Sequence, residues 1–239
     1  MSKLKAATRE KLMHVSTATL CTALYKRGLR GQFIQDVRPL NPNGPNMVGP
    51  AFTLRYIPAR EDLNPITVFN DPNHPQRKAI EDWPPGAVLV IDSRKDARAA
   101  SAGGILVTRL MARGVAGVVT DGGFRDSPEI ALMTIPAYHN RPSAPTNITL
   151  HQGIDADVPI GCGDAPVWPG DIMVGDREGV VVIPAHLADE IASEAHEMTA
   201  FEDFVAEKVR EGRSIVGLYP ATEEKSRTDF AAWRKAKKR

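Results

Sequence analysis

The chain has 239 residues, a length that suits one large domain or two small ones. Hydrophobic residues make up 42% and charged residues 25%, which is ordinary for a folded soluble protein and excludes wholesale disorder. Lys and Arg number 30 against 29 Asp and Glu, so the formal net charge is only +1, and aromatic residues are scarce at 6%. Because such a chain has neither a global positive field nor a stacking platform for bases, we expect no nucleic-acid or membrane partner.

The termini and cysteines predict a soluble, cytoplasmic protein. Residues 1–13 are charged throughout and contain no apolar core of a secretory signal. No stretch approaches the roughly 18 uncharged apolar residues of a membrane span. The two cysteines, Cys21 and Cys162, cannot form a disulfide framework, and we interpret both as small buried apolar residues in a reducing compartment.

The first half of the chain predicts a helix followed by a strand. The helix covers residues 17–28, with Thr17 or Thr19 as its cap and Gly28 to stop it. After a loop rich in Pro and Asn, residues 51–57 read as a strand. The segment 66–82 is interrupted by prolines and stays open, apart from a short helix that QRKAIEDW could form.

The middle of the chain predicts a parallel βαβ unit. Residues 87–92 (AVLVID) and 115–120 read as buried strands on either side of an amphipathic helix over 103–113. The helical spacing predicts that Ile105, Leu106 and Leu110 face inward. The loops at the carboxyl ends of parallel strands usually carry ligands, so we expect a site there.

The last third predicts short strands and a long helix over 186–211, with Leu187, Ile191, Ala195, Met198 and Val205 as its apolar face. Residues 225–239 hold seven Lys and Arg and one Asp, and we expect a frayed, solvated tail. A subunit contact through Phe230 and Trp233, or weak binding to an acidic partner, is the alternative. We therefore predict one domain over 1–212 and a basic tail over 213–239.

The first candidate site is the loop DGGFRD, residues 121–126, directly after a buried strand. Its two glycines allow a sharp turn or a close approach to a ligand. Arg125 offers a planar fork for a carboxylate, and Asp126 offers an oxygen ligand for a hard cation. Such a pair suits a substrate with carboxylate and keto oxygens, although neighbouring Arg and Asp on a loop are often no more than a solvated pair.

The second candidate is SAGGIL, residues 101–106, at the start of the predicted helix. Glycines at a helix N-terminus expose N–H groups that can bind a carboxylate or phosphate. The segment lacks both the GxxxxGK[ST] and the GxGxxG patterns, so nucleotide binding is unsupported. Close helix–strand packing explains the glycines equally well.

Other polar residues carry weaker signals. The spacing of His139, His151, Cys162 and His186 matches no compact set of metal ligands, so core or surface roles are expected. Asp96 and Arg98 precede the glycine segment and are expected to form a salt-linked surface pair, with Arg98 close enough in sequence to face the same pocket.

The two candidate loops also carry a family resemblance. The run GGILVTRLMARGVAGVVTDGGFRD, followed by VWPGDIMVGDREGVVVIP, resembles the RraA-like family, which includes the class II pyruvate aldolases. Gly103 and Arg125 are 22 residues apart, as the family pattern of a glycine-led helix start and a later Arg-Asp pair requires. The resemblance extends from roughly Thr17 to Glu211.

The resemblance implies a role for each matching residue. Asp126 would be the ligand of Mg²⁺, or of Mn²⁺ or another divalent cation, with water completing the shell. Arg125 would bind substrate oxygens and stabilise the enolate. The backbone of Gly103, Gly104, Ile105 and Leu106 would hold the pyruvyl carboxylate.

The resemblance also implies fold, activity and assembly. The fold would be an αββα sandwich resembling the swivelling phosphohistidine domain, with N- and C-terminal helices, assembled as a homotrimer or homohexamer with sites between subunits. The activity would be cleavage or decarboxylation of a 4-hydroxy-2-oxo acid or oxaloacetate, releasing pyruvate through a metal-stabilised enolate.

Two departures and two alternatives accompany this expectation. Gly104 stands where family aldolases often have an acidic or polar residue, and Arg141 is the only strong cation in the segment after the Arg-Asp loop. An acidic residue from a neighbouring subunit's C-terminal helix is also expected. The alternatives are a lyase or dehydratase of a sugar-derived 2-oxo acid, and a non-enzymatic inhibitor of a ribonuclease. Inhibitors of that kind lack the paired Arg-Asp, which favours an enzyme.

Overall fold

The structure is a computed structural model that describes residues 4–238. Its helices are α1 (Ala6–Met13), α2 (Thr17–Tyr25), η1 (Ile66–Asn70), α3 (Pro75–Glu81), α4 (Gly104–Ala112), α5 (Ser127–Ala131), η2 (Asn147–Thr149), η3 (Ala185–Leu187), α6 (Ala188–Arg210) and α7 (Glu224–Lys237). Its strands are β1 (Arg38–Pro39), β2 (Met47–Pro58), β3 (Val88–Asp92), β4 (Ala100–Ala102), β5 (Gly117–Thr120), β6 (Gly123–Phe124), β7 (Ala137–His139), β8 (Arg141–Pro142), β9 (His151–Ala156), β10 (Ile160–Cys162), β11 (Ala165–Val167), β12 (Ile172–Gly175) and β13 (Val180–Ile183).

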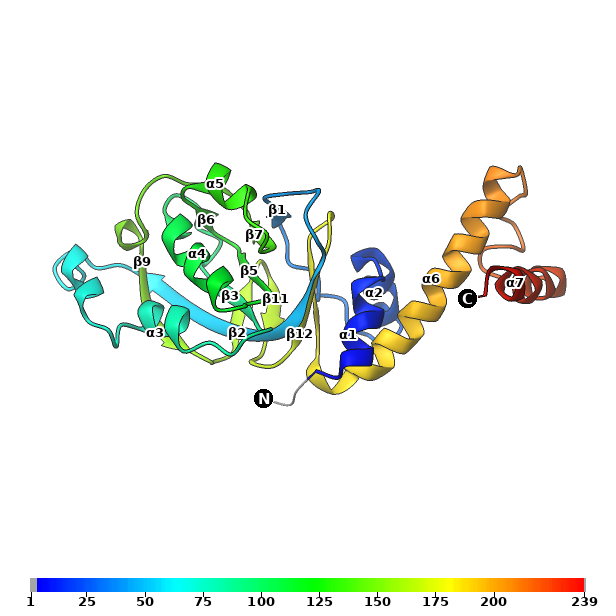
Figure 1. The fold of residues 1–239 in the computed structure, drawn as a ribbon, viewed down its shortest axis with the longest axis horizontal. Coiled ribbons are helices and arrows are strands. Elements are labelled where there is room, and N and C mark those ends of the chain that lie inside the picture. The colour runs from blue at the N-terminus through cyan, green and yellow to red at the C-terminus, as the bar shows by residue number, and fades with distance from the viewer. Residues whose placement is uncertain (1–3, 239) are drawn as a thin grey trace.

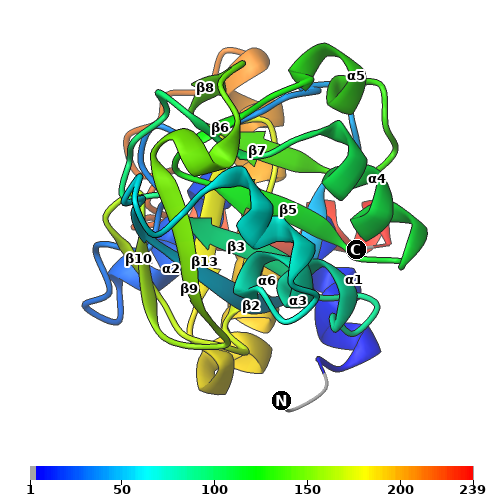
Figure 2. The ribbon, with the colours of Figure 1, turned by 90° about the vertical axis from the view of Figure 1, so that its left-hand side faces the viewer.

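The main sheet is mixed, and its parallel centre positions the site. The strand order is β1-β7-β5-β3-β2-β12-β13, with β9 also pairing with β2. β2, β3, β5 and β7 are parallel neighbours, whereas β1, β9, β12 and β13 join antiparallel. Figure 2 looks onto the end of the molecule where β3, β5 and β7 lie side by side. The predicted βαβ unit is confirmed as β3, α4 and β5, because β3 and β5 pair in parallel with α4 between them in the chain.

Three very short strands form a second sheet above the carboxyl ends of β3 and β5. β6 lies between β4 and β8, and both pairings are parallel. β4 immediately precedes Gly103, and β6 immediately precedes Arg125. Because β4 and β6 pair, the two loops that the sequence predicted separately lie against each other.

Apolar clusters fill both faces of the main sheet. On one face, Leu89, Val118 and their neighbours pack with Val107 and Leu110 of α4. Around β12 and β13, α1, α2 and α6 build a further layer. Figure 1 shows α3, α4 and α5 on the body of the molecule, and α6 running from it toward α7.

The C-terminal segment is an ordered helix, and the predicted frayed tail is wrong for residues 224–237. Trp233 and Phe230 of α7 pack with Phe204 of α6 and with Leu218. Arg213 also pairs with Asp229 of α7 at 2.7 Å. The charged composition of this segment does not predict the small aromatic cluster that these residues form. Among residues 4–238, no helix combines the length and the apolar character that a membrane span requires.

Most predicted elements are confirmed, with small shifts. The predicted strand 51–57 is part of the longer β2, and QRKAIEDW contributes most of α3. The cap of α2 is Ser16, not Thr17 or Thr19, since its hydroxyl accepts from the Thr19 N–H. Cys162 is buried as predicted, whereas Cys21 is only partly buried.

Candidate functional site

The two predicted loops meet at a single point, the N-terminus of α4. The Gly104 N–H donates to Asp126 Oδ2 at 3.0 Å, and the Arg125 N–H donates to the Ala102 carbonyl at 3.1 Å. A Cβ on Gly103 would lie 2.7 Å from Arg125 Cγ and 3.0 Å from Asp126 Oδ2. A side chain at that position would have to displace Arg125, so glycine here permits the close approach of the two loops.

Asp126 stands in an uncommon backbone conformation. Its φ of 57° and ψ of 32° are left-handed, a region that Asp and Asn tolerate better than most residues. The following helix α5 begins at Ser127, and its Ile130 N–H bonds the Asp126 carbonyl at 3.0 Å. The side chain thereby points back toward α4, and both it and Arg125 are 44% exposed.

Arg125 and Asp126 form a loose pair. Arg125 Nε lies 3.7 Å from Asp126 Oδ2, the same oxygen that accepts from Gly104. Within residues 4–238, no hydrogen bond engages Oδ1 of this carboxylate. One carboxylate oxygen is therefore oriented by the protein, and the other is available to a ligand.

Buried polar side chains hold β4 in place beneath the site. The hydroxyls of Ser93, Ser101 and Thr120 contact one another at 2.6 to 3.2 Å. The Ser101 carbonyl accepts from Tyr56 Oη at 2.9 Å and from Gln76 Nε2 at 3.1 Å. Because these donors come from β2 and α3, the position of Gly103 depends on several elements of the core.

Asp121 opens the DGGFRD loop but faces inward. It is 2% exposed and accepts backbone N–H groups from Ser93, Lys95 and Gly163. Burial raises the pKa of its carboxyl to about 6, against the opposing effect of these donors. Its contacts tie three loops together at the carboxyl ends of the strands, so its role is structural.

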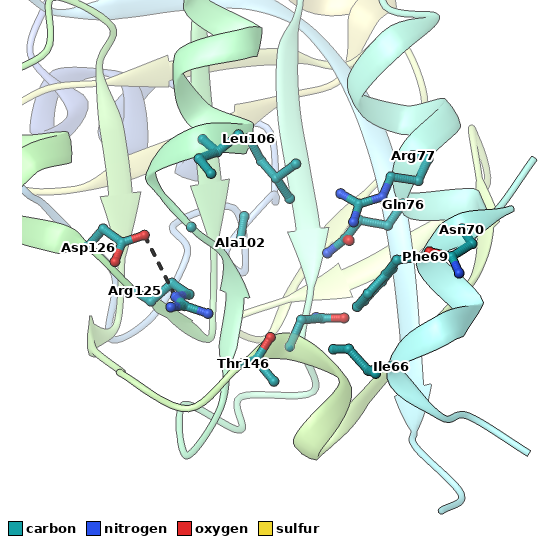
Figure 3. A pocket seen from close by; sticks show the side chains of 13 residues that line it. Ile66, Phe69, Asn70, Gln76, Arg77, Ala102, Leu106, Arg125, Asp126 and Thr146 are labelled. Carbon is teal, nitrogen blue, oxygen red and sulfur yellow. Dashed lines mark ion pairs between the residues drawn. The ribbon is translucent and has the colours of Figure 1, made fainter. Parts of the chain in front are cut away.

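The site opens into a cleft of about 510 Å³ with two walls. One wall carries Arg125 and Asp126, and the other carries Phe69 and Arg77, as Figure 3 shows. The remaining lining residues are Ile66, Asn70, Gln76, Ala102, Gly103, Ile105, Leu106, Thr146 and Asn147. The second wall belongs to η1 and α3. Both lie in the segment 66–82, whose secondary structure the sequence does not predict clearly because prolines interrupt it.

Several predicted residues lie elsewhere than expected. Ile105 is 86% exposed at the rim of the cleft, so its predicted inward orientation is wrong. The buried positions of α4 are Gly104, Val107 and Leu110, since α4 turns its glycine toward Asp126. Leu106 is half-buried and lines the cleft.

Arg98 is not part of the cleft. It pairs with Asp96 at 2.7 Å, which confirms the predicted salt-linked pair. The Arg98 guanidinium lowers the pKa of the Asp96 carboxyl. Arg141, the only strong cation in the segment after the Arg-Asp loop, is also absent from the lining.

The chemistry of the donors can accommodate a divalent cation of the magnesium type. Within residues 4–238, no three His, Cys, Asp or Glu side chains gather in a way that could hold a metal ion. Mg²⁺, however, typically keeps several waters and needs only one or two carboxylates together with substrate oxygens. Asp126, half exposed and with Oδ1 free, fits that requirement.

Fold and site together define an α/β protein with a cleft at the carboxyl ends of parallel strands, where ligands usually bind in such folds. The family model described as RraA-like, Aldolase/RraA, matches residues 17–182, well over half of the chain. The chain belongs to the RraA-like aldolase family.

Relatives and solved structures agree with this assignment. A putative 4-hydroxy-4-methyl-2-oxoglutarate aldolase of Halalkalibacterium halodurans is 31% identical over 70% of this chain and 73% of its own length. The 4-hydroxy-4-methyl-2-oxoglutarate aldolase of Thermus thermophilus is 30% identical over 50% of this chain and 71% of its own.

Among solved structures, the chain is similar to RraAS2 of Streptomyces coelicolor, which is described as an unusual member of the RNase ES inhibitor RraA protein family. The two chains are 29% identical and superpose with a TM-score of 0.73, over 85% of this chain and 98% of RraAS2. An uncharacterized protein of Pseudomonas syringae pv. tomato gives a TM-score of 0.77 at 24% identity, covering 90% and 98% of the two chains, and supports the fold alone. The mixed α/β fold with terminal helices is thus the fold of this family.

Proposed function

We propose that this protein is a divalent-metal-dependent lyase that cleaves a 4-hydroxy-2-oxo acid, or decarboxylates oxaloacetate, and releases pyruvate. The observation that carries the proposal is the convergence of Arg125, Asp126 and the N-terminus of α4 at one end of the cleft. The names of the relatives at about 30% identity, which are 4-hydroxy-4-methyl-2-oxoglutarate aldolases, support the cleavage reaction.

The residues divide the work by their chemistry. Asp126 would hold the cation through Oδ1, with water completing the shell. When bound, the cation polarises the 2-oxo group and stabilises the negative charge that develops on it. Arg125 would bind a substrate oxygen through its planar fork and stabilise the same charge from a second direction.

The start of α4 would bind the pyruvyl carboxylate, but not through all four amides expected from the resemblance. The Gly104 N–H is already bonded to Asp126, and the Leu106 N–H bonds the Gly103 carbonyl at 3.1 Å. We therefore assign the carboxylate to the Gly103 and Ile105 amides, aided by the positive end of the helix dipole.

The two reactions differ in their need for a base. Aldol cleavage requires removal of the C4 hydroxyl proton, whereas loss of CO₂ from oxaloacetate requires no proton acceptor at that stage. Among the described residues that line the cleft, Asp126 is the only carboxylate. We therefore propose that an acidic residue of a neighbouring subunit's C-terminal helix completes the site for aldol cleavage.

The proposed assembly is a homotrimer or homohexamer with an αββα sandwich in each subunit. Ile215, Val216 and Tyr219, between α6 and α7, expose 50 to 79% of their surface, and Ile105 is exposed at the cleft rim. Exposed apolar residues of this kind suit an interface. Light scattering should give three or six times the chain mass of 26.0 kDa, and a fully active monomer would contradict the shared site.

The decisive experiment is a panel of 2-oxo acids assayed for pyruvate release, with and without Mg²⁺ or Mn²⁺. We expect release from oxaloacetate or from 4-hydroxy-4-methyl-2-oxoglutarate, and only with the metal. Turnover of a sugar-derived 2-oxo acid alone would favour the alternative lyase or dehydratase. Inhibition of a ribonuclease without any pyruvate release would favour the non-enzymatic alternative. The similarity to RraAS2, a member of a family of ribonuclease inhibitors, is the observation that supports this alternative.

A further inference from the structure

The wall of the cleft opposite Arg125 carries a second cation, Arg77 of α3 (Figure 3). Its guanidinium carbon lies 4.6 Å from the ring centroid of Phe69 in η1, a cation–π contact. The two side chains are both partly buried. Stacking on the ring restricts the guanidinium while leaving its N–H groups able to bind a ligand.

Arg77 has no acidic partner within residues 4–238. No carboxylate among residues 4–238 lies within 4.0 Å of its guanidinium nitrogens, whereas the next residue of α3, Lys78, pairs with Asp82 at 3.7 Å. Arg125, the other cation of the cleft, already has Asp126 beside it. The lining residues that the structure describes thus carry two positive charges and one negative charge, and the excess positive charge lies at the end remote from Asp126.

A ligand that crosses this cleft meets different chemistry at its two ends. The end at Arg125 and Asp126 suits carboxylate and keto oxygens, as argued above. Between the two ends lie the apolar side chains of Leu106 and Ala102 (Figure 3). The end at Arg77 offers a planar cationic fork, which matches the geometry of a second carboxylate.

We propose that Arg77, held on the face of Phe69, binds the distal carboxylate of the substrate and makes the protein selective for dicarboxylic over monocarboxylic 2-oxo acids. This inference rests on the proposed function, since it takes the pyruvyl group to lie at Arg125. Arg77 of α3 is then the specificity-determining residue, whereas Arg141, which follows the Arg-Asp loop, does not line the cleft.

Binding of two matched, unreactive compounds tests the inference without turnover. 2-Oxoglutarate and 2-oxopentanoate differ only in a carboxylate replaced by a methyl group, and titration calorimetry in the presence of Mg²⁺ gives both dissociation constants. The wild type should bind 2-oxoglutarate more tightly. Arg77→Met should weaken 2-oxoglutarate roughly 10- to 100-fold, the usual loss for a charge-assisted hydrogen bond, and leave 2-oxopentanoate unchanged.

Two variants control for charge and for folding. Arg77→Lys keeps the charge and should restore part of the preference, and Lys78→Met removes a neighbouring charge of α3 outside the cleft and should change neither constant. Equal affinity of the wild type for the two compounds, or equal weakening of both by Arg77→Met, would overturn the inference, as would failure to bind 2-oxoglutarate.

The same variants separate this inference from the proposed function. With 4-hydroxy-4-methyl-2-oxoglutarate and its monocarboxylic counterpart 4-hydroxy-4-methyl-2-oxopentanoate, Arg77→Met should raise KM for the first compound only and leave kcat nearly unchanged. If the wild type released no pyruvate from either compound but bound 2-oxoglutarate in an Arg77-dependent way, the lyase would fail and the assignment of Arg77 would stand.

Discussion

The backbone N–H of Gly104 donates to the Asp126 carboxylate across 3.0 Å, joining two loops 22 residues apart in the chain. This bond orients one carboxylate oxygen and leaves the other without a hydrogen bond within residues 4–238. It also explains why α4 turns a glycine, and not Ile105, toward the neighbouring loop. The candidate site is therefore a junction between two loops, and its geometry depends on both.

Arg125→Lys separates charge from geometry. The variant keeps the positive charge but loses the planar fork, so it should stabilise the developing enolate poorly. We expect kcat to fall by ~10²–10³, the usual cost of one oxyanion donor, while KM rises less because the helix N-terminus still binds the pyruvyl group. Steady-state kinetics on the substrate identified by the panel measures both constants. An unchanged kcat with a raised KM would make Arg125 a plain carboxylate anchor.

Gly103→Ala tests the close approach of the two loops. The added Cβ would stand 2.7 Å from Arg125 Cγ and 3.0 Å from Asp126 Oδ2, so the Arg125 side chain must shift to admit it. We expect kcat/KM to fall by ~10²-fold, since displacement of a positioning group by about 1 Å is enough for such a loss. Gly161→Ala is the matched control, because its Cβ would meet nothing within 4 Å. Equal activity of the two variants would show that the spacing at Gly103 is unimportant.

His139 predicts a loss of stability in mild acid. Burial beside Phe124 lowers the pKa of its imidazole to about 4, so the unfolded chain takes up a proton at higher pH than the folded one does. The neutral imidazole contributes fully to the free energy of unfolding above about pH 6.5. As the pH falls toward 4, that free energy decreases by roughly 2–3 kcal/mol.

The measurement is urea unfolding of the wild type and of His139→Phe between pH 4 and 7. The variant keeps an aromatic ring against Phe124 but cannot titrate. As the pH falls from 7 to 4, the free energy of unfolding of the variant should therefore increase relative to that of the wild type. Asp121 acts in the opposite sense, because burial raises the pKa of its carboxyl to about 6, and this effect cancels in the difference. Parallel curves for the two proteins would contradict the assignment.

The sequence predicts the parallel unit and the Arg-Asp loop because buried strands such as AVLVID are continuous apolar runs. It does not predict the three-stranded sheet that brings the loops together. β4, β6 and β8 are two or three residues long, too short for any periodicity to appear. Helical spacing likewise shows that α4 has an apolar face, but not which residues of that face point into the core. For this reason the predicted inward orientation of Ile105 is wrong.

Two further features depend on contacts between distant segments. The wall with Phe69 and Arg77 forms from a proline-interrupted segment whose local pattern indicates neither helix nor strand clearly. In the C-terminal segment, Phe230 and Trp233 find their partners on α6, which no local pattern reveals among so many charges. Tertiary packing decides both.

The most direct test of the central claim is metal-dependent pyruvate release by Asp126→Asn. Asn keeps an oxygen that can accept from the Gly104 N–H but loses the charge that a hard cation requires. The variant should fold like the wild type by circular dichroism and thermal unfolding, yet release no pyruvate at any Mg²⁺ concentration, just as the wild type should lose activity on treatment with EDTA and regain it with Mg²⁺. Full activity of Asp126→Asn, or of the wild type after exhaustive removal of metal, would contradict a metal-dependent lyase at this site.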